Sequence, residues 1–281
     1  MTRRSKERQR ISGTAMIEYQ SFLARLYTDD VFRRLNRISP AAAESFFRLN
    51  HVETACLRRL DLDEIDAFAG SLAARSREQL RGLLPASVRA LGDAAADRAC
   101  DRFRSLHRSA PGERPIDLLR GFGRFLEESL RADDSQPEWL PELVRCEVAL
   151  RECGLQGARS PATSHALAAP GDGVFRLADG VRVAAYAFDV LPWLDKPEPP
   201  AREPARGVTH ALMIPQAGSR HPKVMKLNLL AARLLGSFGH GKSREAVAHA
   251  LEGVAAAPDL AHAIRSAVQR FAMAGALVAV Q

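Results

Sequence analysis

The chain has 281 residues, of which 46% are hydrophobic and 26% charged, and it carries a formal net charge of +7. These proportions are ordinary for a soluble globular protein, and the length allows one large domain or two ordinary ones. No apolar run approaches the ~20 residues that a membrane span needs. The basic residues 1–10 are not followed by the apolar segment of a secretory signal. We therefore expect a cytoplasmic protein that contacts no membrane.

The positive charge is unevenly distributed along the chain. Residues 2–10 hold five basic side chains and one acidic side chain, residues 174–281 hold 13 basic and eight acidic side chains, and residues 11–173 are close to neutral. We expect residues 1–13 to form a basic, disordered tail. The surplus in the C-terminal part suits an acidic partner but does not identify one.

Residues 14–155 are predicted to form an all-helical domain, because apolar residues recur at spacings of three and four along most of this segment. Ser39, followed by Pro40, is typical of a helix start, and so is Asp93. Pro85 is expected to end a helix or to start the next one. The pattern indicates a bundle or array of helices with short connections.

The four cysteines, Cys56, Cys100, Cys146 and Cys153, show no CxxC spacing and no grouping with histidine. We therefore expect reduced thiols. Cys146 and Cys153 are seven residues apart and would share one face of a helix, which more often means core packing than a disulfide or a metal site.

The character of the sequence changes at about residue 155. Residues 156–173 lack periodicity and are rich in Gly, Pro, Ser and Ala, which is typical of a linker. Two apolar runs within 174–188 then flank the dipeptide Asp179-Gly180, which predicts a β-hairpin.

Further strands are predicted at 208–214 and 223–228, after a proline-rich spacer at 197–207 that cannot join the interior of a sheet. Helices follow, and residues 276–280 form a last strand candidate. This order predicts a small winged-helix-like domain of three strands and three helices over 174–281. The whole chain is therefore expected to be α+β and mostly α, with an N-terminal helical bundle before this domain. The last helix carries an apolar stripe of Leu260, Ile264, Val268 and Phe271.

Residues 236–243, GSFGHGKS, match the phosphate-loop pattern G-x-x-x-x-G-K-[ST]. A functional phosphate loop follows a buried strand, whereas the residues before 236 have the pattern of a helix. Only 38 residues follow Ser243, too few for the rest of a nucleotide-binding core. We therefore interpret the glycines as a turn between helices and Ser243 as an N-cap. A nucleotide-using enzyme is the least favoured alternative.

The chain offers no recognisable catalytic or metal-binding pattern. Its eight histidines show neither H-x-x-x-H nor H-E-x-x-H spacing, and no G-x-S-x-G nucleophile elbow occurs. We therefore predict no catalytic residue, no metal ligand and no cofactor in this chain, and we expect that it is not an enzyme.

The strand predicted at 223–228 runs directly into a helix. If this strand lies at the edge of its sheet, its free N–H and C=O groups could pair with an incoming extended peptide. An edge strand that is merely protected by its lysines fits the same residues equally well.

Two phrases in this region, VMKLNLLAARLLGSFGHGKSREAVAHAL (224–251) and FAMAGALV (271–278), resemble the PqqD-like recognition element of RiPP biosynthesis, the production of ribosomal, modified peptides. Such elements bind the leader of a precursor peptide as an added strand against their third strand and last helix. Carried over by position, the resemblance implies these peptide-binding residues: Val224, Met225, Lys226, Leu227, Asn228, Arg265, Val268, Gln269 and Ala272.

The helical part of the chain is similar to another family. The segments MIEYQSFLARLYTDDVFR (16–33), LRGLLPASVRALGD (80–93) and LPELVRCEVALRE (140–152) resemble the N-terminal domain of HvfC/BufC/TglI-type partner proteins. Those proteins accompany multinuclear non-heme iron oxidative enzymes of the methanobactin-B-like family, which act on peptidyl cysteines. The resemblance implies a non-catalytic subunit of a heterodimer. Residues 14–155 would dock the enzyme, the C-terminal domain would hold the leader, and the iron would belong to the partner.

A winged-helix DNA-binding transcriptional regulator is the main alternative, because winged-helix domains often bind DNA and the N-terminal tail is basic. Against it, the last helices offer His262, Arg265 and Arg270 rather than a dense basic face. We therefore do not expect nucleic acid as the partner.

Overall fold

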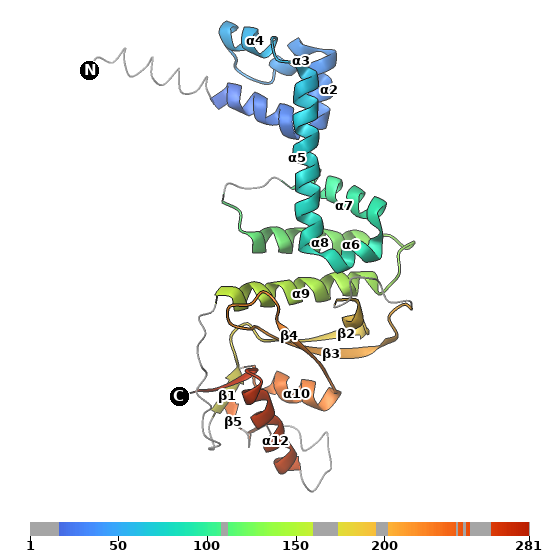
Figure 1. Ribbon diagram of the computed structural model, residues 1–281, viewed down its shortest axis with the longest axis vertical. Coiled ribbons are helices and arrows are strands. Elements are labelled where there is room, and N and C mark those ends of the chain that lie inside the picture. The colour runs from blue at the N-terminus through green and yellow to red at the C-terminus, as the bar shows by residue number, and fades with distance from the viewer. Residues whose placement is uncertain are drawn as a thin grey trace, which may run out of the picture. The chain divides into compact units, whose positions relative to one another are not determined.

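The computed structural model describes residues 17–107, 112–159, 174–194, 202–239, 241–243, 246–247 and 260–280. The protein is α+β and mostly helical, with a helical region and a small winged-helix-like domain (Figure 1). Its contacts divide it into two compact units. The N-terminal unit comprises Met1–Gly82 and Asp97–Arg108, and the C-terminal unit comprises Leu83–Ala96 and Ser109–Gln281.

The N-terminal unit is built from helices around an aromatic core. Phe22 and Phe32 meet edge to face, with ring centroids 5.1 Å apart, and Leu26, Leu57 and Ile65 are buried with them. The helices are residues 17–28, α2 (Asp30–Ile38), α3 (Pro40–Glu44), α4 (His51–Leu57), α5 (Leu62–Leu83) and α7 (Asp93–Leu106).

Local capping explains where two of these helices begin. The Asp29 side chain accepts a hydrogen bond from the Phe32 N–H at 2.9 Å and so caps α2. Asn50 and Glu53 form a reciprocal capping box at the start of α4. The helix start predicted at Pro40 is confirmed, and α7 begins at Asp93, as predicted.

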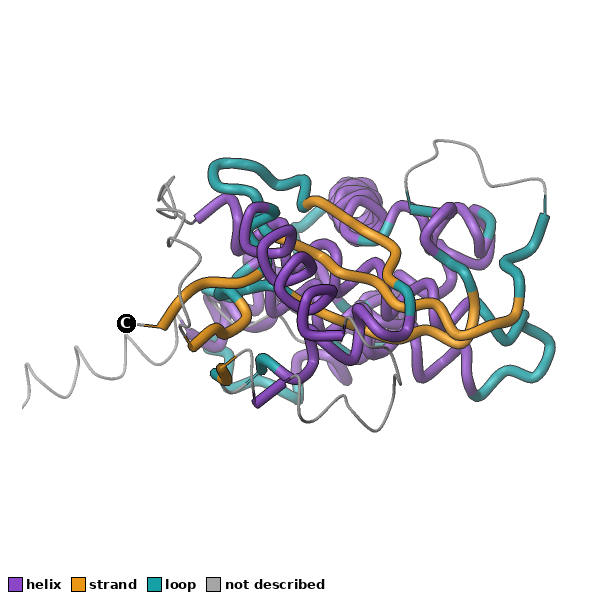
Figure 2. Tube along the Cα trace, turned by 90° about the horizontal axis from the view of Figure 1, so that it is seen from below, coloured by secondary structure: helices purple, strands orange, loops and turns teal. Residues whose placement is uncertain are grey.

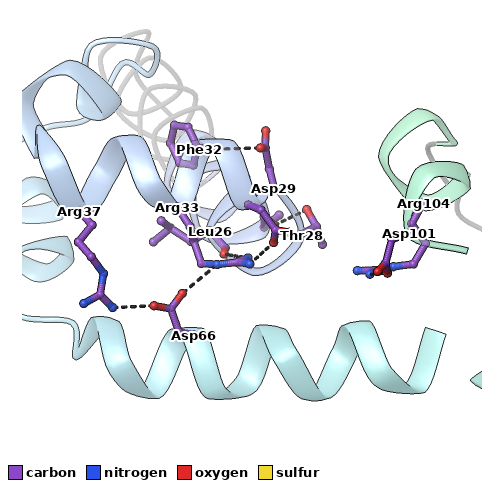
Figure 3. Close-up of polar contacts among 11 residues, drawn as sticks. Leu26, Thr28, Asp29, Phe32, Arg33, Arg37, Asp66, Asp101 and Arg104 are labelled. Atoms are coloured by element: carbon purple, nitrogen blue, oxygen red, sulfur yellow. Dashed lines mark hydrogen bonds and ion pairs between the residues drawn. The ribbon is translucent and has the colours of Figure 1, made fainter. Parts of the chain in front are cut away.

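Several arginine side chains of the N-terminal unit are paired with carboxylates on the same or a neighbouring helix. Arg33 and Arg37 of α2 reach Asp66 of α5 at 3.0 and 2.6 Å (Figure 3). Arg33 also pairs with Asp30 on its own helix. The further pairs are Arg25–Asp29, Arg58–Glu44, Arg77–Asp101, Arg81–Asp97 and Arg104–Asp101.

The C-terminal unit begins with helices α6 (Pro85–Leu91), α8 (Pro115–Arg131) and α9 (Leu140–Arg159). The helix start predicted at Pro85 is confirmed. Cys146 and Cys153 both lie on α9, and both are free thiols that are fully buried. The interpretation of these two cysteines as core residues is therefore confirmed.

Two antiparallel three-stranded sheets complete this unit. The first has the order β2 (Arg182–Phe188), β3 (Arg206–Ile214), β4 (Lys223–Leu227). The second, smaller sheet has the order β5 (Lys242–Ser243), β1 (Val174–Leu177), β6 (Leu277–Val280). The strands predicted at 208–214, 223–228 and 276–280 are thus confirmed.

The predicted β-hairpin at 174–188 is wrong. Strands β1 and β2 exist, and the chain turns at Asp179 and Gly180, whose φ is +80°. However, β1 pairs with β5 and β6, whereas β2 pairs with β3. The turn therefore carries the chain from one sheet to the other. The prediction failed because a turn dipeptide determines the local backbone but not which strand each neighbouring strand pairs with.

The sheet of β2, β3 and β4 is covered on both faces. Helix α9 contacts β2 and β3, and α10 (Leu229–Ser237) contacts all three strands, on the opposite side of the sheet in Figure 1. In Figure 2, which is seen from below, helices lie in front of the strands. The core on this side includes Leu212, Leu227 and Phe238, together with Ile264, Val268 and Phe271 of α12 (Leu260–Met273). Three of the four residues of the predicted stripe are thus confirmed as core, and the Leu260 side chain lies outside the described residues.

Several predicted segments fall on residues that the structure does not describe. The tail at 1–13 lies outside the described residues, and so does most of the predicted linker at 156–173, although α9 continues to Arg159. The boundary between a helical domain and a C-terminal domain therefore stays a prediction.

Candidate functional site

The outer edge of β2 is capped by side chains of α9. The Arg145 guanidinium donates to the Ala185 carbonyl at 2.8 Å, and the Glu142 carboxylate accepts from the Ala187 N–H at 3.0 Å. Arg145 and Glu142 also pair with each other at 2.8 Å. The Ala185 C=O and the Ala187 N–H are therefore occupied from within the protein, which hinders another strand from pairing at this part of the edge.

The hydrogen bond at the Ala185 carbonyl shows which residues of each strand point their main-chain groups toward the neighbouring strand. Because N–H and C=O groups alternate between the two sides of an antiparallel strand, the outward Ala185 carbonyl means that its neighbours point toward β3. Ala185 lies opposite His210, and His210 lies opposite Leu227. His210 and Leu227 therefore exchange hydrogen bonds, as do Leu212 and Met225.

The same alternation leaves the main-chain groups of Val224 and Lys226 pointing away from β3. Strand β4 is the last strand of its sheet, and no other described strand pairs with its outer side. Two residues thus offer both N–H donors and C=O acceptors at an open edge. Strand β4 therefore meets the condition for pairing with an extended peptide, because it lies at an edge of its sheet.

The side chains of β4 divide between the two faces of the sheet. Met225 and Leu227 pack into the core beneath α10, whereas Val224 and Lys226 lie on the face of α9. The Lys226 ammonium pairs with the Asp189 carboxylate at 2.7 Å. The Lys226 side chain therefore has a partner within the protein, whereas no described strand pairs with its main-chain N–H and C=O groups.

Asn228, a predicted peptide-binding residue, has a structural role. Its side chain accepts from the Ala231 N–H at 2.8 Å and caps α10. The turn from β4 into α10 is fixed by this cap, which holds the end of the open edge in one conformation.

The residues predicted on α12 occupy different environments. Arg265 and Gln269 are exposed, Ala272 is half-buried, and Val268 is buried at 2% exposure. Ala272 packs against the same core as Met225 of β4. The Ala272 side chain therefore lies in the same apolar cluster as β4. The Val268 side chain is a buried member of that cluster.

The loop between β3 and β4 is docked on α9 through two glycines, a feature that sequence reasoning missed. A Cβ atom at Gly154 would overlap the Arg220 carbonyl oxygen. One turn further, the Gly157 carbonyl accepts from the Gly218 N–H at 3.0 Å. These contacts hold the start of β4 against α9, and their only sequence signal is a pair of glycines three apart in a helix.

Two buried carboxylates of α9 also bind neighbouring elements. Glu147 accepts from the N–H groups of Ala86 and Ser87 at 2.9 and 2.8 Å, in the first turn of α6. Glu152 pairs with Arg120 of α8 and with Arg182 of β2, the latter at 2.5 Å. Helix α9 is therefore the element to which both the other helices and the sheet are attached.

The buried thiols are poor nucleophiles. Burial raises the pKa of Cys146 to about 12, and it raises those of Cys100 and Cys153 to about 11. The Tyr186 hydroxyl bonds with Cys146, and burial raises its pKa as well. These groups stay protonated and neutral at physiological pH.

An open hollow of about 460 Å³ lies beside the capped edge of β2. Its walls include Ala187 and Phe188 of β2 and charged residues of both signs, such as Arg131 and Asp133. Because neither charge dominates, the lining does not identify a ligand.

Residues 236–243 are arranged differently from a phosphate loop. Gly236 and Ser237 are the last two residues of helix α10, and Lys242 and Ser243 form β5, which pairs with β1. The Ser243 hydroxyl accepts from the Ala246 N–H at 3.2 Å, as an N-cap does. The predicted N-cap at Ser243 is thus confirmed, whereas the glycine turn leads from α10 into strand β5 rather than directly into a helix.

Within the described residues, no group of three or more His, Cys, Asp or Glu side chains is placed to hold a metal ion. None of the helices in that part of the chain is long and apolar enough to cross a membrane. No protein-family model matches the chain, and no curated protein is significantly similar to it.

Proposed function

We propose that this protein is a non-catalytic subunit that binds the leader of a ribosomal precursor peptide and presents the peptide to a multinuclear non-heme iron oxidative enzyme. The observation that carries the proposal is the asymmetry of the sheet. On one edge, β2, Glu142 and Arg145 bind two main-chain groups, whereas on the other edge, β4, no described strand pairs with the outward main-chain groups of Val224 and Lys226. An extended peptide satisfies such an edge by adding a strand.

Presenting the substrate requires no catalytic residue in this chain. Holding the leader raises the local concentration of the attached substrate segment at the active site of the partner. The resemblance of 16–33, 80–93 and 140–152 to the partner-protein family supports a heterodimer with the oxidase, and the iron then belongs to that enzyme.

The test uses the full chain and the leader of a cysteine-containing precursor peptide encoded beside the gene. We expect binding that Val224→Pro abolishes, because proline removes an N–H that points out of the sheet. Met225→Pro is not a suitable control for binding, because it removes a hydrogen bond between β4 and β3 and so disturbs the sheet itself. Ala279→Pro is the matched control, because Ala279 has the same outward position on the edge strand β6 of the smaller sheet.

Equal affinities of the wild-type chain and Val224→Pro would refute the proposed edge. Failure of the chain to co-purify with the iron enzyme encoded beside it would refute the role as a subunit.

The alternative of a DNA-binding regulator is favoured by one observation, the exposed Arg265 and Arg270 on α12. Binding of duplex DNA with a steep dependence on salt would support it. The docking of the β3–β4 loop on α9 argues against it, because a loop fixed at Gly154 and Gly157 is not free to enter a groove.

A further inference from the structure

The segment that carries the open edge contains no acidic residue. Residues 204–243 hold six lysines and arginines but no aspartate or glutamate. This segment forms β3, β4, α10 and β5. The segment therefore carries a local surplus of positive charge, which favours an acidic ligand.

Other parts of the chain balance only some of that charge. Arg206 lies 3.7 Å from Glu138, and Lys226 lies 2.7 Å from Asp189. Four further cations of the segment are exposed and have no carboxylate within 4.0 Å among the residues that the structure describes. These four are Arg220, Lys223, Arg233 and Lys242.

Two of the unpaired cations lie at one end of β4, and apolar side chains lie at its other end. Arg220 precedes the strand and Lys223 begins it. Leu229 and Leu230 follow it in the first turn of α10, where their exposed fractions are 53% and 38%. The edge is therefore cationic at its start and apolar at its end.

The main chain of the edge distinguishes between classes of anionic ligand. Val224 and Lys226 offer carbonyl acceptors as well as N–H donors. Phosphate groups of nucleic acids and of lipid headgroups accept hydrogen bonds but do not donate them to a carbonyl. A peptide main chain supplies both partners at the spacing of a strand.

From the charge and the main chain together, we infer that the ligand of β4 is an extended acidic peptide. Its acidic side chains lie beside Arg220 and Lys223, and its apolar side chains lie beside Leu229 and Leu230. This inference rests on the proposed binding at β4 and adds the chemical class of the segment that is bound.

The test is a selection from a random peptide library displayed against the immobilised full chain. We expect the peptides that Val224→Pro no longer captures to be rich in aspartate and glutamate toward one end and in apolar residues toward the other. For a selected peptide, Lys223→Glu should weaken binding about fivefold, because an attraction becomes a repulsion at an exposed site. Lys242→Glu is the matched control, since it reverses an exposed, unpaired charge in the other sheet and should leave affinity unchanged.

The outcomes separate this inference from the proposed function. Peptides that depend on Val224 but show no acidic preference, or that bind Lys223→Glu as well as wild type, would overturn the inference and leave the binding edge standing. If no selected peptide depends on Val224, the edge itself is refuted. If Lys223→Glu weakens the binding of duplex DNA but not of the selected peptides, the cations serve a nucleic acid and the inference is wrong.

Discussion

The two α2 arginines of the N-terminal unit and the cations beside β4 in the C-terminal unit differ in whether a carboxylate neutralises them. In the N-terminal unit, Arg33 and Arg37 are neutralised by carboxylates on the same or a neighbouring helix. In the C-terminal unit, Arg182 of β2 is paired with the buried Glu152 of α9, whereas Arg220 and Lys223 beside the open strand are exposed and have no carboxylate partner among the described residues. The α2 arginines join two helices, whereas Arg220 and Lys223 lie where a ligand can reach them.

The same contrast holds for main-chain hydrogen bonds. The edge of β2 is closed by Glu142 and Arg145, and the loop before β4 is fixed on α9. The outer side of β4 is left open by the described strands. A rigid frame around one open strand is suited to binding, because the frame is ordered before the ligand arrives.

The largest effect is expected at the buried carboxylate that joins α9 to α6. Glu147→Ala removes the acceptor of the Ala86 and Ser87 N–H groups and leaves both buried without a partner. We expect the free energy of unfolding to fall by about 3 kcal/mol. Both tryptophans of the chain, Trp139 and Trp193, lie in the C-terminal unit, so their fluorescence during urea denaturation measures this change in that unit.

The control for this prediction is Glu138→Ala, which removes a carboxylate at 74% exposure. Its effect should stay within about 0.5 kcal/mol. A similar loss from both variants would show that α9 is not held by the buried contact.

The next effect compares two neighbouring residues of β4. Met225→Pro removes an N–H that bonds to β3 and should lower the free energy of unfolding by about 2 kcal/mol. Val224→Pro removes an N–H that points outward and should cost less than about 1 kcal/mol. Urea denaturation followed by tryptophan fluorescence gives both values, and the reverse order would contradict the assignment of which residues face outward.

A smaller effect is expected for an ion pair of the N-terminal unit. Arg33→Ala removes the contacts to the exposed Asp30 and Asp66 and a hydrogen bond to the Leu26 carbonyl at 2.8 Å, and should cost about 1 kcal/mol. The loss should shrink further as salt is added. Thermal denaturation followed by circular dichroism at two salt concentrations measures this, and a loss that is insensitive to salt would show that packing of the Arg33 side chain dominates.

The smallest perturbation is chemical labelling of the native thiols. Cys56 is exposed, whereas Cys100, Cys146 and Cys153 are buried, with pKa values raised to about 11 or 12. We expect iodoacetamide at neutral pH to modify Cys56 first. Mass spectrometry over time then compares local opening at Cys100 of the N-terminal unit with opening at Cys146 of the C-terminal unit. Rapid modification of Cys146 in the native protein would contradict the packing of α9.

Features that depend on neighbouring residues in the sequence were predictable. Helix starts at Pro40, Pro85 and Asp93, the strands at 208–214 and 223–228, and the cap at Ser243 all follow from local backbone preferences and periodicity. The edge position of 223–228 was not predicted from the sequence, and only the strand order shows it.

Features that depend on distant partners were not predictable in the same way. The turn at Asp179 and Gly180 was identified, but the strands around it joined different sheets. Glu142, Glu147 and Glu152 have the spacing of ordinary helix-surface carboxylates, and only the fold shows that they bind β2, α6 and a pair of arginines. A polar residue on a helix does not reveal from sequence whether water or a buried N–H is its partner.

Hydrogen exchange at the main-chain N–H groups of β4 tests the central claim most directly. In the free protein, we predict slow exchange at Met225 and Leu227 and fast exchange at Val224 and Lys226, measured by nuclear magnetic resonance on the full chain. Addition of the leader peptide should slow exchange at Val224 and Lys226. Slow exchange at these two residues in the free protein, or unchanged exchange with saturating leader peptide, would contradict the account.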